Sequence, residues 1–184
     1  MNETGKVRLG LIPALAERHP AGHIGRTALM KYMYFLQTLR NIPLGYRFSM
    51  YSYGPFDSNV LSDLSSAEAM GVVSSTPIAF SGGFGYEIRP AQNATRAKQS
   101  IESFLAEHED DVSWLFKHFG ALNSAQLELA STVVYVNREF AEAGHTAGTA
   151  EIAARVREIK PHFNKEEIEQ SVESLRVSGL ILAA

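Results

Sequence analysis

YSYGPFDSNVLSDL, residues 51–64, is the stretch that decides how the first half of this 184-residue chain folds. Aromatic and small residues alternate up to the Gly-Pro pair, and a helical pattern begins directly after it. Pro55 cannot donate a backbone hydrogen bond to a sheet, so we expect the strand to end there. Asp57 is a favoured N-cap residue, and Phe56 and Leu61 stand at the two positions of a hydrophobic staple. Packing and capping therefore account for this turn without any reactive chemistry.

The residues around this turn predict the element order of a winged-helix module. Apolar residues with helical spacing precede it, and two β-type runs around a glycine-rich tip follow it. The predicted elements are helices at 7–18 and 27–40, a strand at 46–53, a helix at 57–70 that ends at Gly71, a short strand at 72–75, and a hairpin at 76–90 with its wing tip at 81–85. Pro13 predicts that the first helix is kinked or starts late. The sequence leaves open whether the helix at 57–70 is continuous or broken near its two central serines.

The second half of the chain predicts a helical module. Two Asn-x-x-Gln/Glu patterns, at Asn123 and Asn164, have the spacing of capping boxes at helix starts. The predicted elements are helical residues 93–119 interrupted at 107–111, a largely apolar helix after Asn123, a helix-turn-helix and a strand-like tail at 180–182. The first helix of the helix-turn-helix carries an apolar stripe over 152–159, and the second follows Asn164 and ends at Gly179. The fold class is therefore mainly α with a small β-hairpin (α+β). We expect a winged-helix-like module of residues 1–92 to pack, as one compact unit, on a helical module of residues 93–184.

The composition and motifs predict a protein that is not an enzyme. Cysteine is absent, which removes disulfides, thiolate nucleophiles and cysteine-based metal sites. His19 and His23 are four apart, but Pro20 and Gly22 lie between them, and no HExxH, GxSxG or GxxxxGK[ST] motif occurs. We expect no catalytic residues, no cofactor and no metal. Neither a secretory pattern nor a membrane-spanning apolar run is present, which favours a cytoplasmic protein without a membrane partner.

Charge is distributed unevenly along the chain. The net charge is −3; residues 1–92 hold 8 Lys/Arg and 6 Asp/Glu, whereas residues 93–184 hold 9 and 14. Candidate nucleic-acid contacts are Arg26, Lys31, Arg40, Arg47 and Arg89, with four further cations at 155, 157, 160 and 165. Phosphate binding needs clustered cations, and neither set is dense. The last predicted helix carries glutamates at 166, 167, 169 and 173, which repel DNA and suit a protein partner better.

Two segments carry a resemblance to a known family. GRTALMKYMYFLQ and FSMYSYGPFDSNVLSDL resemble the signature of the Panacea antitoxin-domain family (SocA-like, phage-associated proteins) and its YwgA-like bacterial relatives. The matching positions are Lys31, Tyr34, Tyr53, Gly54 and Pro55, and EIKPHFNKEEIEQSVESLRVSGLI resembles the tail of the YwgA-like branch. The signature departs from the usual Leu/Gln-rich start at Ala28-Leu29-Met30. The resemblance implies a largely helical, winged-helix-like fold in which the signature positions are mainly structural.

The resemblance also implies a function. Some members of this family neutralise a toxin encoded beside them, and one type hands its toxin to a protease. The leading hypothesis is a non-enzymatic protein-binding protein, an antitoxin or phage-associated regulator whose partner is a toxin encoded nearby. The alternative is a winged-helix regulator that binds DNA through the cations named above.

Overall fold

The computed structural model describes residues 2–80 and 83–182, and the chain divides into two compact units. Unit 1 comprises Met1–Phe48 and Asp57–Leu122, and unit 2 comprises Ser49–Phe56 and Asn123–Ala184. The boundary expected between residues 92 and 93 lies inside unit 1. The short segment 49–56 interrupts unit 1 because it belongs with the C-terminal helices. The described residues are mainly helical with two small antiparallel sheets, which confirms the α+β class. The winged-helix assignment stays a prediction.

The helices of unit 1 surround an aromatic core. They are α1 (Glu3–Arg18), α2 (Arg26–Leu39), α3 (Ser58–Ala69), α4 (Ala94–Gln99), α5 (Glu102–Glu107) and α6 (Glu109–Phe119). Of the apolar stripe that helical spacing predicts for α2, Leu29, Met33 and Leu36 are buried and Leu39 is partly buried. Phe35 stacks on Phe119 of α6 with 3.9 Å between ring centroids. Helix α1 begins earlier than predicted, at Glu3, and runs through Pro13. Asp57 caps α3 as predicted, with a 2.8 Å hydrogen bond from the Asn59 N–H, and α3 is one continuous helix.

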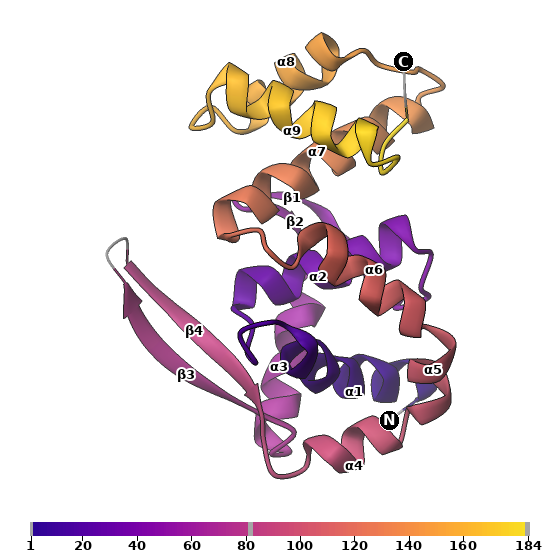
Figure 1. Cartoon of the computed structure of the whole chain (residues 1–184), viewed down its shortest axis with the longest axis vertical. Coiled ribbons are helices and arrows are strands. Elements are labelled where there is room, and N and C mark those ends of the chain that lie inside the picture. Colours follow the sequence, from indigo (N-terminus) through magenta and orange to yellow (C-terminus); the bar gives the residue numbers. More distant parts are fainter. Residues whose placement is uncertain (1, 81–82, 183–184) are drawn as a thin grey trace. The chain divides into compact units, whose positions relative to one another are not determined.

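A long hairpin completes unit 1. It consists of β3 (Val73–Phe80) and β4 (Gly83–Pro90), and Figure 1 shows it extending away from the helices of this unit. The strand predicted separately at 72–75 is the start of β3, because β3 is continuous into the hairpin. Ile24, between α1 and α2, bridges to Ile88 of β4 through two backbone hydrogen bonds of 3.2 and 2.8 Å. Of the expected wing tip at 81–85, residues 81–82 lie outside the described residues and the rest belong to β4.

Unit 2 combines a very short hairpin with three helices. Its elements are β1 (Ser49–Tyr51), β2 (Gly54–Phe56), α7 (Ser124–Glu142), α8 (Thr149–Ile159) and α9 (Lys165–Val177), and α7 contacts β2, α8 and α9. The strand expected at 46–53 is therefore too long, and Pro55 does not end the sheet but pairs with Met50. A two-stranded sheet leaves an open edge on each strand, where a residue without N–H is tolerated. Gly54 has φ of 84° and allows the chain to reverse there.

Capping fixes the starts of α7 and α9 as the sequence predicts. The Asn123 and Asn164 side chains each accept a 2.9 Å hydrogen bond from the N–H three residues on, and both capping boxes are complete. Phe163 and Ile168 are buried on either side of the second cap. The strand expected at 180–182 is absent, because the turn at Gly179 (φ 67°) brings the Leu180 N–H to the Leu175 carbonyl instead.

Across the described residues, no helix is both long and apolar enough to cross a membrane.

The capping box of α9 gives a first prediction. Asn164→Ala removes the acceptor for the Glu167 N–H and lowers the free energy of unfolding by about 1 kcal/mol. Urea denaturation followed by circular dichroism measures the change. The control is Gln170→Ala, an exposed position on the same helix. Equal stability of the two variants would contradict the capping role.

Candidate functional site

The β1–β2 hairpin of unit 2 exposes two tyrosines. Tyr51 is 65% exposed and Tyr53 is 73% exposed, although large aromatic side chains are usually covered. Between these tyrosines and the start of α3, Gly54 and Pro55 are buried, and the Tyr51 ring stacks on Phe56 at 5.5 Å. The hairpin therefore exposes two aromatic side chains to solvent, while the residues that directly follow them, Gly54 and Pro55, are buried.

A buried lysine anchors the tip of this hairpin. Lys160 follows α8, is 2% exposed, and donates hydrogen bonds from its ammonium to the backbone carbonyls of Tyr51 (3.0 Å) and Ser52. Its Nζ also lies 3.1 Å from Oε1 of Glu128 on α7. The ammonium thus donates to two turn carbonyls, and the Glu128 carboxylate balances its charge as an ion pair. The lysine therefore ties the hairpin tip to two helices of the same unit.

The acidic partner of this lysine is buried as well. The Glu128 side chain is 8% exposed, and its Oε1 also lies 3.4 Å from Nε2 of His162, whose side chain is largely exposed. A buried ion pair adds little net stability, because both charges lose hydration, but removing one partner is costly. The pair therefore acts mainly to fix geometry, and the geometry it fixes is that of the turn between Tyr51 and Gly54.

The signature residues fall into both units. Lys31 and Tyr34 lie on α2 of unit 1 and are buried, with 2% and 3% exposure. The Tyr34 ring meets that of Phe48 edge-on at 5.1 Å. Tyr53, Gly54 and Pro55 lie on the hairpin of unit 2. Four of the five matching positions are thus buried, and Tyr53 alone among them has a side chain in solvent.

The five candidate nucleic-acid cations all belong to unit 1, and three of them pair with other side chains of that unit. The Arg26 guanidinium lies 3.5 Å from the centre of the Tyr86 ring, and Arg89 pairs with Glu87 at 2.8 Å. Arg40 Nε donates to Asp111 Oδ1 at 2.6 Å. Burial of Asp111 works against ionisation, but hydrogen bonds from His108 and Arg40 outweigh it and hold the pKa of Asp111 below its ordinary value.

The two remaining cations differ in exposure. Lys31 is buried, so it offers no charge to a phosphate at the surface. Arg47 is exposed, and its backbone N–H donates to the Asp57 cap at 2.5 Å. Helix α3 contains no lysine or arginine and carries Asp63 and Glu68. The described residues thus offer no dense cationic face on α3 or beside it.

The sequence did not reveal the contacts of Lys160 with Glu128 and the hairpin, and Lys160 was grouped with the candidate cations near the turn between the last two helices. Glu128 and Lys160 are far apart in the chain, and no local pattern pairs them. The one available signal was a carboxylate inside a helix whose other faces are apolar, since a buried charge needs a partner.

Among the described residues, no group of three or more His, Cys, Asp or Glu side chains is arranged to hold a metal ion. No protein-family model matches the chain, and no curated protein matches it.

The anchor gives a second prediction. Lys160→Met leaves Glu128 buried without its partner and lowers the free energy of unfolding by about 3–5 kcal/mol. Replacing both residues, as Lys160→Met with Glu128→Leu, recovers most of this loss, because no buried charge is then left without its partner. Urea denaturation measures the free energy of unfolding of all variants. The control is Lys165→Met at an exposed position, which should change this free energy by about 0.5 kcal/mol or less. A double variant no more stable than Lys160→Met would contradict the pairing.

Proposed function

We propose that this protein acts in the cytoplasm by binding another protein, as an antitoxin-like regulator that neutralises its partner without catalysis. The observation that carries the proposal is the pair Tyr51 and Tyr53, exposed on a hairpin that Lys160 anchors. Tyrosine is enriched among the residues that contribute most to protein–protein binding. A fixed backbone also reduces the entropy lost on association. The hairpin therefore suits a protein surface that accommodates two aromatic side chains presented on a fixed backbone.

The antitoxin part of the proposal rests on the family resemblance. The Tyr-Gly-Pro-Phe segment that carries the resemblance, residues 53–56, contains one of the two exposed tyrosines, Tyr53. Some members of that family neutralise a toxin encoded beside them. A toxin from an adjacent gene is therefore the partner we propose, with the hairpin of unit 2 as part of the contact surface.

One observation favours the alternative of a DNA-binding winged-helix protein. In unit 1 the order is α1, a bridge at Ile24 to β4, α2, α3, then the β3–β4 hairpin. This order supports the alternative, with the bridge at Ile24 in the place of the first strand of a winged helix. The third helix of such a module is the one that enters DNA. In this chain that helix has no cation and two carboxylates, which supports a protein-binding rather than a DNA-binding use of the module.

Co-expression with each adjacent gene product, followed by pull-down, tests the proposal. We expect one product to co-purify and to stay bound as salt rises, because an apolar contact responds little to screening. Combining Tyr51→Ala with Tyr53→Ala should weaken this binding on the order of 100-fold, as expected for two interface tyrosines. The matched control is Phe84→Ala, which removes an exposed aromatic side chain from the other hairpin.

A gel shift on the upstream region of the gene tests the alternative. Binding to DNA would weaken steeply with salt and would be lost on replacing Arg26, Arg47 and Arg89. Such a shift, with no protein co-purifying, would overturn the proposed function in favour of a DNA-binding regulator.

A further inference from the structure

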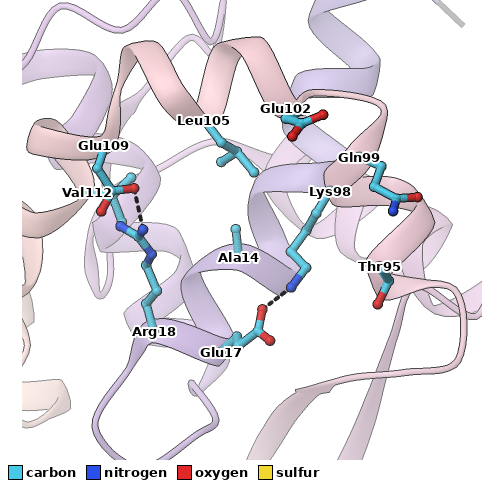
Figure 2. Close-up of a pocket in the computed structure, with 10 residues that line it drawn as sticks. All are labelled: Ala14, Glu17, Arg18, Thr95, Lys98, Gln99, Glu102, Leu105, Glu109 and Val112. Carbon is cyan, nitrogen blue, oxygen red and sulfur yellow. Dashed lines mark hydrogen bonds and ion pairs between the residues drawn. The ribbon is translucent and has the colours of Figure 1, made fainter.

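Unit 1 contains a cavity that the proposed function does not use. It has a volume of about 390 Å³ and lies among α1, α4, α5 and α6. Its apolar lining comes from Ala14 of α1, Leu105 of α5 and Val112 of α6, and Figure 2 shows Ala14 and Leu105 directed into the same space. Cavities that hold small molecules have volumes of about 300–1,000 Å³ and mostly apolar walls. The size and the lining thus fit a small organic molecule.

The two cations at the rim of this cavity are already paired. Lys98 of α4 pairs with Glu17 of α1, and Arg18 of α1 pairs with Glu109 of α6 (Figure 2). The hydrogen bond from Arg18 lowers the pKa of Glu109, so this carboxylate stays ionised at neutral pH. An anionic ligand would have to displace a carboxylate from one of these pairs. The rim therefore does not favour an anion.

The rest of the rim is polar. Glu102 of α5 and Thr95 and Gln99 of α4 line the same cavity, and Figure 2 marks no hydrogen bond or ion pair between these three side chains and the other residues drawn. With three carboxylates against two cations, the charged side chains of the lining sum to −1. The unpaired charge is the Glu102 carboxylate, which accepts hydrogen bonds and attracts a cation.

We propose that this cavity binds a small organic cation, an alkyl or arylalkyl amine. The apolar body of the amine lies against Ala14, Leu105 and Val112, and its ammonium donates to Glu102, with Gln99 and Thr95 as neighbouring polar groups. The contact of the body removes apolar surface from water, and the charged hydrogen bond sets the orientation. This binding is independent of the protein partner, because it uses other residues in the other unit.

Titration of the ¹⁵N-labelled full chain with n-hexylamine, followed by NMR, tests the inference. We expect the shifted amides to cluster at the cavity-lining residues of α1, α4, α5 and α6. The probes n-hexanol and hexanoate share the apolar body and should bind more weakly, because they lack the ammonium. Glu102→Gln should weaken n-hexylamine binding about tenfold, the effect of one exposed charged hydrogen bond, and leave n-hexanol unchanged. The matched control is Glu107→Gln, an exposed position on the same helix that does not line the cavity.

A second variant tests the apolar part of the site. Ala14→Leu places a larger side chain in the cavity and should abolish n-hexylamine binding. Equal affinity for the amine, the alcohol and the carboxylate would overturn the inference, as would unchanged amine binding in Glu102→Gln. The first outcome is read from the wild type and the second from a surface substitution that leaves the core intact, so the test holds even where Ala14→Leu lowers stability.

Discussion

The geometry of unit 2 depends on one ammonium group, that of Lys160. A lysine removed from water must replace its lost hydration with protein oxygens, and here it finds two turn carbonyls and the Glu128 carboxylate. These oxygens come from β1–β2 and α7, while the lysine itself follows α8. Each element therefore restricts the others. A hairpin of two three-residue strands is marginal by itself, and this anchor gives it a defined shape with Tyr51 and Tyr53 outward.

Local signals made much of the fold predictable. The caps at Asp57, Asn123 and Asn164 act within three residues of chain, so their positions in the sequence were sufficient to place helix starts. The apolar stripe of α2 could be predicted just as directly, because a 3.6-residue period identifies the buried face of a helix. These interactions need no knowledge of distant residues, and the structure confirms them.

Interactions between distant residues were not predictable in the same way. Pro55 was expected to end a strand because proline has no N–H to donate to a sheet. That argument does not reveal that a two-residue turn precedes Gly54 and that Pro55 lies in a second strand. Segment 49–56 was assigned to the first module by its position, whereas its partners are α7 and Lys160. The candidate cations were selected by charge alone, and charge does not reveal that Arg40 is paired with Asp111 or that Lys31 is buried. The candidate site therefore emerged from pairings that sequence spacing does not encode.

A double-mutant cycle between Lys160 and Tyr53 tests the central claim, that the buried lysine holds the hairpin in the shape that the proposed protein partner recognises. The measurement is the affinity of the co-purified partner for the wild type, Tyr53→Ala, Lys160→Met and the double variant. If Lys160 acts by positioning the tyrosines, Tyr53→Ala should cost much less affinity in the Lys160→Met background than in the wild type. Additive losses, or full affinity in Lys160→Met, would contradict the account.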